Sequence, residues 1–308
     1  MNLLPKLRNE FIQVLWKRFR QDYGPAEQLA QFISDREGVV PLDHFAIIEL
    51  PNPLGEDREL ETLLVAIGFK KEGAGYLPDK INDFCWFVEE DAATKSIQAA
   101  LPKIVLGNFR LGECSFETKR VIERISQLPT LNSAMVLKLA QEVRDGVEPS
   151  YFRLLSILIE TFTRRPCLSP LTREFQRVQE ENELMAWSML FGREINHFGL
   201  SVYALQHFAS LEAFNHTVTE KLNFRLNECG GFIVKGGPQD GIAQSATVNT
   251  YTSKKLTDGS VTVRSPFLEF VWRFPITASP TSTWKDYFQG FVAKNANRVI
   301  ESVYRAEA

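Results

Sequence analysis

The chain contains few of the residues that most often bind metals. Its 308 residues include only four histidines and four cysteines. The cysteines, Cys85, Cys114, Cys167 and Cys229, lie far apart and form no CxxC pair. This spacing excludes the usual cysteine zinc sites and argues against a disulfide framework at this length. We expect free thiols that are buried or half-buried, as is typical of cysteine.

Long apolar runs and a large excess of charge are also absent. No apolar stretch approaches the roughly 20 residues of a membrane-spanning helix, and residues 1–23 lack the apolar block of a signal peptide. The formal net charge of −3 argues against nucleic acid or an anionic membrane as the main partner. The 44% hydrophobic content is typical of a globular protein with a sizeable core. We expect a cytoplasmic protein, and its oligomeric state stays open.

Hydrophobic periodicity divides the chain into four parts. Residues 1–39 and 116–190 favour helix, whereas residues 40–115 and 191–308 are rich in short strands. Both β-rich parts share an order: a strand that carries a histidine, a helix, and then several strands. We predict an α+β protein in which paired βαβββ modules form an incomplete barrel around a cavity. The helical stretch is then an insertion, and a helix closes the second module.

Within the second module, finer boundaries are predicted from the same periodicity. Strands are expected at 224–227, 231–235 and 243–251, and the closing helix at 287–304. Asp258-Gly259 predicts a tight turn between two strands.

Glu269 lies in the strand-like run Ser265-Pro-Phe-Leu-Glu-Phe-Val-Trp-Arg-Phe274, which is almost entirely apolar. An isolated buried charge is costly, so the carboxylate must be paired, protonated or bound to a metal. Arg273 shares its face, but four residues of one strand separate the two Cα atoms by roughly 13 Å. Arg273 is therefore not the expected partner, although another cation could serve.

Two of the four histidines, His44 and His197, also lie in predicted strands. Alternate residues of a strand share a face, so both imidazoles are expected among small or apolar neighbours. The neighbours predicted for His44 are Leu42, Ala46 and Ile48, and those for His197 are Ile195, Gly199 and Ser201. Two imidazoles and a carboxylate form the ligand set of a non-haem Fe(II) site. The alternative for each histidine is a core imidazole with one hydrogen-bonded partner. His207 and His216 are expected at the surface.

The segment from Gly230 to Thr247 is unusually rich in glycine. It lacks the GxxxxGK[ST] pattern, so a nucleotide-binding loop is not expected. Four polar residues in it could present a cation and neutral donors to an anionic ligand: Lys235, Gln244, Ser245 and Thr247. The alternative is a glycine-rich hairpin with exposed polar tips.

Several short motifs together are similar to those of one known family. They are Asp43-His44-Phe-Ala, Asn196-His197-Phe, the run from Gly230 to Thr247, Asp258-Gly259, Glu269-Phe-Val-Trp-Arg273 and Phe288-Gln-Gly-Phe291. The chain resembles the 2-oxoadipate dioxygenase/decarboxylase (hydroxyglutarate synthase) family, which has the vicinal oxygen chelate fold. The resemblance extends from about residue 40 to the C-terminus.

This resemblance implies an Fe(II) ion held by His44, His197 and Glu269, which would also be the catalytic residues. It implies a 2-oxo acid that chelates the iron, and O2 as the second substrate. The products would be a hydroxy acid and CO2. With Zn(II), Ni(II) or Mn(II), the same site would suit a non-oxidative isomerase or lyase. Besides these two kinds of enzyme, the remaining alternative is a metal-free binding protein with a vestigial site.

The chain departs from the family at one position. Members that use 2-oxoadipate carry an arginine four residues after the first histidine, where it binds the distal carboxylate. This chain has Ile48 there, and an apolar side chain cannot replace a bidentate clamp. Either another cation such as Lys235 or Arg273 takes this role, or the substrate lacks the second carboxylate.

Overall fold

The computed structural model describes most of the chain. The described residues are 1–53, 59–127, 131–165, 168–278, 280–281 and 283–300. Among them, Cys85, Cys114 and Cys229 are free thiols, two of them buried and Cys229 half-buried. Cys167 lies outside the described residues.

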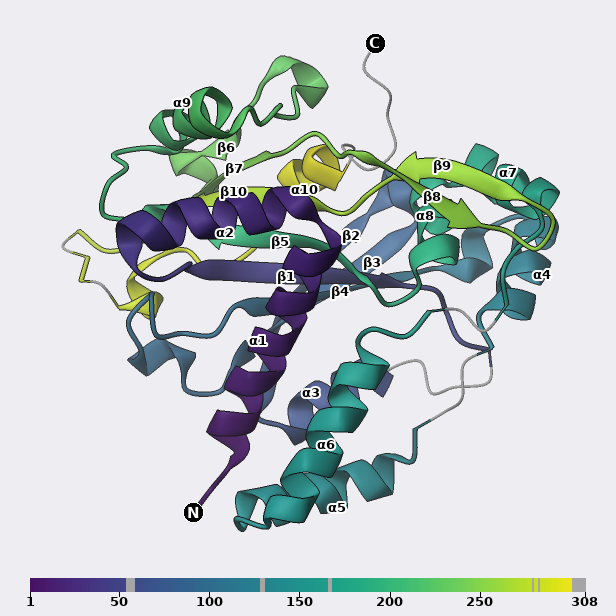
Figure 1. The fold of residues 1–308 in the computed structure, drawn as a ribbon, viewed down its shortest axis with the longest axis horizontal. Helices are drawn as coiled ribbons and strands as arrows, with labels where there is room; N and C mark the ends of the chain where they lie inside the picture. The colour runs from purple at the N-terminus through teal and green to yellow at the C-terminus, as the bar shows by residue number, and fades with distance from the viewer. Residues whose placement is uncertain (54–58, 128–130, 166–167, 279, 282, 301–308) are drawn as a thin grey trace.

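One curled sheet of eight strands forms the centre of the fold (Figure 1), in the order β2-β3-β4-β1-β5-β10-β7-β6. The strands of the first half are β1 (Leu42–Glu49), β2 (Phe69–Leu77), β3 (Asn82–Glu89) and β4 (Lys103–Phe109). Those of the second half are β5 (Ile195–Ser201), β6 (Lys235–Gly237), β7 (Ile242–Ala246) and β10 (Phe267–Arg273). A separate hairpin pairs β8 (Tyr251–Lys255) with β9 (Ser260–Arg264), and the predicted Asp258-Gly259 turn lies between them.

The two halves of the sheet have the same strand arrangement. β1 pairs in parallel with β4, and β5 pairs in parallel with β10. Next to each parallel pair lies an antiparallel strand: β3 pairs antiparallel with β4, and β7 pairs antiparallel with β10. The halves meet where β1 and β5 pair antiparallel. The predicted α+β fold of paired modules in an incomplete barrel is confirmed.

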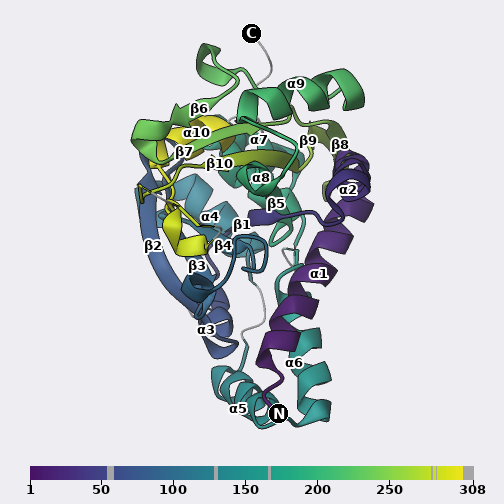
Figure 2. The ribbon, with the colours of Figure 1, turned by 90° about the vertical axis from the view of Figure 1, so that its left-hand side faces the viewer.

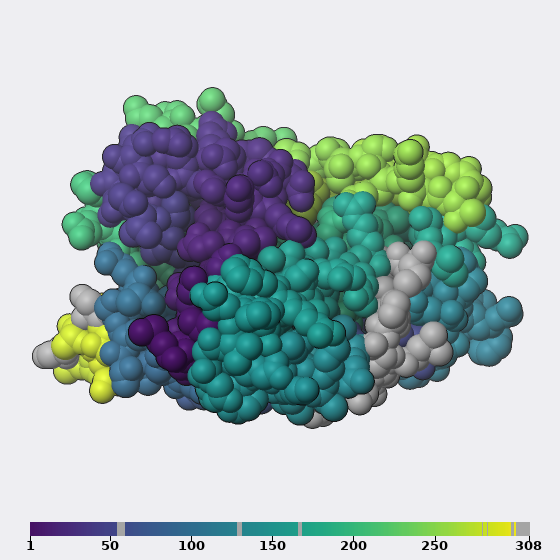
Figure 3. All heavy atoms as spheres, turned by 60° about the horizontal axis from the view of Figure 1, so that its bottom comes forward, coloured from purple at the N-terminus to yellow at the C-terminus, as the bar shows by residue number. Residues whose placement is uncertain are grey.

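Helices pack against both faces of the sheet. They are α1 (Leu4–Asp22), α2 (Gly24–Glu37), α3 (Glu59–Ala66), α4 (Phe116–Ile125), α5 (Ser133–Arg144), α6 (Glu148–Thr161), α7 (Thr172–Glu181), α8 (Glu183–Phe191), α9 (Leu211–Leu222) and α10 (Ala293–Ile300). On one side of the molecule, α1, α2 and the α5–α6 pair form a continuous helical surface (Figure 3). In the described part of the chain, no helix is long and apolar enough to cross a bilayer.

Two hydrophobic cores lie on opposite faces of the sheet, because alternate strand residues point to opposite sides. In β1, Phe45 and Ile47 contribute to the outer core, which includes residues of α1, α2, α6 and α9. Ile48 contributes to the inner core, together with residues of β3, α4, α7 and α8. The cavity described below lies on the inner face.

Helix α10 bridges the open side of the barrel. The sheet ends at β2 and β6, and α10 packs against β2 as well as β6 and β7 (Figure 2). The helix predicted at 287–304 begins only at Ala293, so its predicted start is wrong. Residues 301–304 lie outside the described residues. The carbonyls of Phe288 and Gly290 accept hydrogen bonds from Arg273, and the Phe288 N–H donates to Phe274. These bonds keep the backbone there out of a helix.

The glycine-rich segment also departs from prediction. Gly230 and Gly231 have φ angles of 79° and 82°, a left-handed conformation in which the chain turns instead of extending. The predicted strand at 231–235 is therefore wrong, and pairing starts at Lys235. The predicted strand at 243–251 is interrupted after Ala246, and only one isolated bridge forms within 224–227.

Candidate metal centre

A β-bulge precedes His44 in strand β1. Leu42 pairs with Leu200 and His44 pairs with Gly199, so Asp43 is an extra residue without a partner in β5. Leu42 packs against the outer core, whereas His44 lines the inner cavity. The prediction that these two residues share a face is wrong, because alternation holds only where a strand has no bulge.

Strand β5 carries a bulge at the matching place. His197 pairs with Ala46 and Ile195 pairs with Ile47, which leaves Asn196 as the extra residue. Ile195 belongs to the outer core, so its predicted common face with His197 is also wrong. In both halves the bulge residue comes directly before the histidine.

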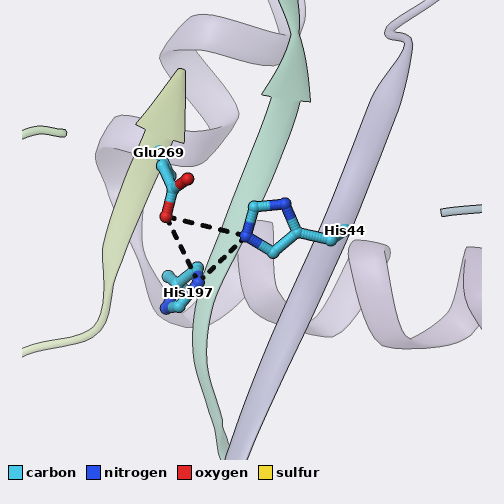
Figure 4. Close-up of side chains that lie close together, drawn as sticks. All are labelled: His44, His197 and Glu269. Carbon is cyan, nitrogen blue, oxygen red and sulfur yellow. Dashed lines mark hydrogen bonds and ion pairs between the residues drawn. The ribbon is translucent and has the colours of Figure 1, made fainter. Parts of the chain in front are cut away.

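Glu269, His44 and His197 converge from three neighbouring strands (Figure 4). The Nε2 atoms of the two histidines lie 3.2 Å apart. Oε2 of Glu269 lies 3.6 Å from Nε2 of His44 and 3.5 Å from Nε2 of His197. All three residues are buried. A circle through atoms with these separations has a radius of about 2.0 Å, close to the bond lengths of about 2.0–2.2 Å for nitrogen and oxygen ligands of a metal such as zinc.

The bulge residues fix the tautomers of the histidines. Oδ1 of Asp43 lies 2.8 Å from Nδ1 of His44, and Oδ1 of Asn196 lies 2.9 Å from Nδ1 of His197. Each oxygen accepts a hydrogen bond from Nδ1–H, so each Nε2 carries a lone pair. In the neutral form of both rings, two nitrogen lone pairs and a carboxylate therefore meet with no hydrogen atom between them. This arrangement is unfavourable without a cation, so the donor set fits a metal ion.

Asp43 is itself held by buried cations. Nε and Nη2 of Arg273 donate to its two carboxylate oxygens at 2.7 and 2.8 Å, and Nζ of Lys103 lies 3.8 Å away. Burial would raise the pKa of Asp43, but the two cations hold the pKa well below its usual value. Asp43 is therefore ionised at neutral pH and can only accept a hydrogen bond from His44.

The two imidazoles differ in their electrostatic surroundings. Burial lowers the pKa of His44, but the carboxylates of Glu269 and Asp43 outweigh it, and the net pKa is raised. His197 has an amide in place of a carboxylate at Nδ1, and burial lowers its pKa to about 3. Burial would raise the pKa of Glu269, but the imidazoles lower it below its usual value. His197 is thus neutral and Glu269 ionised at neutral pH, the forms that bind metals.

One residue of the predicted substrate-binding set lies at this centre. The amide of Gln244 donates to Oε1 of Glu269, on the far side of the carboxylate from the histidines, and Gln244 lines the same cavity. Arg273 lies nearby but donates to Asp43 and to two backbone carbonyls.

The other members of that set lie elsewhere. The ammonium of Lys235 donates to backbone carbonyls, and the Ser245 hydroxyl donates to Asn215. Thr247 Oγ1 accepts a hydrogen bond from the Leu268 N–H. Substrate binding by these residues and by Arg273 stays a prediction.

Sequence reasoning assigned no role to the two bulge residues. The available signal was the repeated Asp/Asn-His-Phe pattern, Asp43-His44 in one half and Asn196-His197 in the other. Of the two remaining histidines, His207 is exposed and pairs with Glu37.

A largely apolar cavity adjoins the three converging residues. Its apolar walls come from Ile48, Leu77, Phe84, Val105 and Phe291. Phe291 also packs edge-on against the His44 ring, with 4.9 Å between the ring centroids.

The internal repeat gives Glu269 a counterpart in the first half. Glu269 pairs with Gly199, two residues after His197. Two residues after His44, the pairing partner in β4 is Val105. The first half therefore supplies one candidate ligand and the second half supplies two.

Fold and site together define the class of protein: an α+β chain with the vicinal oxygen chelate fold and a buried His-His-Glu group that could hold a metal. No family model matches the chain. It is similar to a chloroplastic 2-oxoadipate dioxygenase/decarboxylase of Arabidopsis thaliana, with 24% identity over 233 residues, 72% of this chain and 57% of that protein. The rice protein of the same name is 29% identical over 140 residues, 43% of this chain and 38% of its own length. The chain thus spans little more than half of the first relative.

Solved structures share the fold. Hydroxyglutarate synthase from Oryza sativa, in complex with 2-oxoadipate, has a TM-score of 0.76 at 20% identity and covers 98% of this chain and 94% of its own. A protein assigned to the glyoxalase superfamily from Ralstonia eutropha has a TM-score of 0.73 at 17% identity, with coverages of 91% and 84%. The resemblance predicted from the sequence motifs is confirmed.

Proposed function

We propose that this chain is a non-haem Fe(II) enzyme that uses O2 to decarboxylate and hydroxylate a 2-oxo acid. The observation that carries the proposal is the convergence of two imidazole lone pairs and one carboxylate in a buried cavity. The names of the similar proteins support the oxygenase reaction and the 2-oxo acid.

In this proposal His44, His197 and Glu269 hold the metal. Fe(II) with two histidines and one carboxylate supplies oxygen activation and keeps positions open for a chelating 2-oxo acid and for O2. Asp43 and Asn196 hold the imidazoles in the binding tautomer. Gln244 holds Oε1 of Glu269 and leaves Oε2 directed at the imidazoles.

The proposed reaction is balanced without an external reductant. One 2-oxo acid and one O2 give one CO2 and one 2-hydroxy acid that is a carbon shorter. The C1–C2 bond breaks, one oxygen atom enters the new carboxylate at the former C2, and the other becomes a hydroxyl on the former C3. Decarboxylation and oxidation of the C3–H bond each supply two of the four electrons that reduce O2.

The test is anaerobic reconstitution with Fe(II), followed by oxygen-electrode and CO2 measurements across a panel of 2-oxo acids. We expect one iron per chain and equal amounts of O2 consumed and CO2 released. His44→Ala and Glu269→Ala should abolish stoichiometric iron and turnover, whereas His207→Ala, at an exposed histidine, should change neither. Iron-loaded protein that consumes no O2 with any 2-oxo acid would contradict the proposal.

A further inference from the structure

We infer that the 2-oxo acid used by this site has an uncharged and apolar side chain, in contrast to a dicarboxylate such as 2-oxoadipate. This inference rests on the proposed function of the same centre and specifies its substrate class. It is argued from the walls of the cavity and from the partners of buried cations.

The walls beside the candidate ligands are apolar on the side of the first module. Ile48 follows His44 on the inner face of β1, and Val105 of β4 occupies the position that Glu269 has in the second module. Phe84 and Leu77, from β3 and β2, extend this wall. The side of the centre that lacks a fourth protein ligand therefore offers methyl groups and an aromatic ring to a substrate side chain.

No lysine or arginine is present among the described residues that line the cavity. Three buried cations of the sheet already have partners. Arg273 donates to both oxygens of Asp43 and to two carbonyls. Lys103 lies 3.8 Å from the same carboxylate, and Lys235 donates to backbone carbonyls.

Apart from the three candidate ligands, the polar side chains among the described residues of the cavity wall are two amides. Gln244 is bound to Glu269, and Nδ2 of Asn82 is buried with no hydrogen-bond partner among the described residues. A neutral N–H can bind an oxygen atom, but it does not offset the cost of burying a full negative charge. A distal carboxylate would therefore be poorly stabilised here.

The decisive pair of substrates is 2-oxohexanoate and 2-oxoadipate. Both have six carbons, and they differ only in a methyl group where 2-oxoadipate has its distal carboxylate. With the Fe(II)-loaded protein we expect kcat/KM for 2-oxohexanoate to be higher by about tenfold or more. An equal or higher value for 2-oxoadipate overturns the inference and leaves the proposed function intact.

Binding provides a readout that does not depend on turnover. Calorimetric titration of the Mn(II)-loaded protein under argon should show tighter binding of 2-oxohexanoate, again by about tenfold. If the iron enzyme turns over no 2-oxo acid, the proposed oxygenase function fails, and this titration still decides the inference. Tighter binding of 2-oxoadipate, or no binding of either acid, would overturn it.

A matched pair of variants tests the role of charge in the wall. Ile48→Arg adds a cation to the inner face of β1, and Ile48→Met adds length without charge. We expect Ile48→Arg to shift the ratio of the two affinities toward 2-oxoadipate by about tenfold, and Ile48→Met to leave the ratio nearly unchanged. The metal content of each variant shows whether the centre still forms, and the wild-type comparison stands even if Ile48→Arg does not fold.

Discussion

At the scale of single residues, Asp43 connects a buried guanidinium to a candidate metal ligand. It accepts two hydrogen bonds from Arg273 and one from Nδ1 of His44. The equivalent residue of the second half, Asn196, contacts His197 in the same way but carries no charge. The two histidines are thus oriented by the same geometry but differ in the charge of the residue that orients them. Asp43 is the positioning residue of His44, and Asn196 is that of His197.

Asp43→Asn should weaken metal binding and destabilise the fold. The amide cannot neutralise Arg273, so a buried cation loses its partner, which costs about 3–5 kcal/mol. Loss of the partner on a metal-binding histidine typically lowers affinity by about 10- to 100-fold. Urea unfolding and metal titration measure the two effects.

The control is Asp83→Asn, the same chemical change in the exposed pair of Asp83 with Arg110. Exposed pairs contribute little to stability, so this variant should unfold nearly as the wild type and bind metal normally. Equal losses in both variants would mean that the buried position of Asp43 has no special importance.

Metal affinity should fall as the pH is lowered. The net pKa of His44 is raised above its ordinary value of about 6.5, so near neutral pH a proton competes with the ion for this imidazole. Affinity should therefore increase with pH from about 6 to 8, with proton release on binding. Calorimetry in two buffers of different ionisation enthalpy measures the released protons. Binding that does not change over this range would contradict the raised pKa of His44.

At the scale of elements, the pairing of β1 with β5 places both histidines. Gly199 of β5 lies directly under the His44 ring: a Cβ atom there would be 2.6 Å from both Cε1 and Nδ1 of the imidazole. The absence of a side chain at this position is what allows His44 to lie flat against its neighbouring strand.

Gly199→Ala should displace the His44 ring and lower metal affinity by about tenfold or more, while the fold is retained. Gly112→Ala is the matched control, because a Cβ atom at Gly112 meets no atom within 4 Å. Isothermal titration with Mn(II) compares the two variants. Unchanged affinity in Gly199→Ala would contradict the described packing of the ring.

The helices and strands could largely be predicted from sequence. Apolar residues that recur every two residues indicate a half-buried strand, and those that recur about every 3.6 residues indicate a half-buried helix. The set of His44, His197 and Glu269 was predicted from the ligand types, from the matching places of the two histidines and from the family resemblance, with a core imidazole as the alternative for each histidine. The bulges could not be predicted, since one extra residue reverses a face without changing the local composition.

The predicted substrate-binding set shows a different limit. Gln244 and Ser245 were grouped because both are polar, but neighbours in a strand face opposite sides, and only Gln244 lines the cavity. Arg273 was considered as a ligand for a carboxylate. Its carboxylate partner is Asp43, 230 residues away in the chain, and such a long-range pair leaves no local pattern.

At the scale of the whole molecule, the candidate ligands join the two halves. His44 comes from the first half of the sheet, and His197 and Glu269 come from the second. An ion bound by all three would link the modules across the β1–β5 seam. Any such ion stabilises the folded state by mass action, because the unfolded chain does not hold the three ligands together.

We expect a metal concentration of 100 times the Kd to add about 2.7 kcal/mol of stability, or roughly 5 °C in Tm for a chain of this size. Differential scanning calorimetry with Mn(II) and with EDTA measures the difference. Glu269→Ala should show little or none of this shift. A shift of the same size in that variant would place the stabilising ion at another site.

Val105 shows what the internal repeat implies for the chemistry. A fully symmetric pair of modules would place a second carboxylate opposite Glu269 and surround an ion with four protein ligands. In this chain Val105 takes that place, so the candidate ligand set among the described residues has three members. Val105→Glu would restore the symmetric set and remove an open position. A metal centre with three protein ligands can admit both a chelating substrate and a gas molecule, whereas a fourth ligand gives a more enclosed Lewis-acid centre. Within this fold, a single inward-facing position of β4 can thus decide between the two.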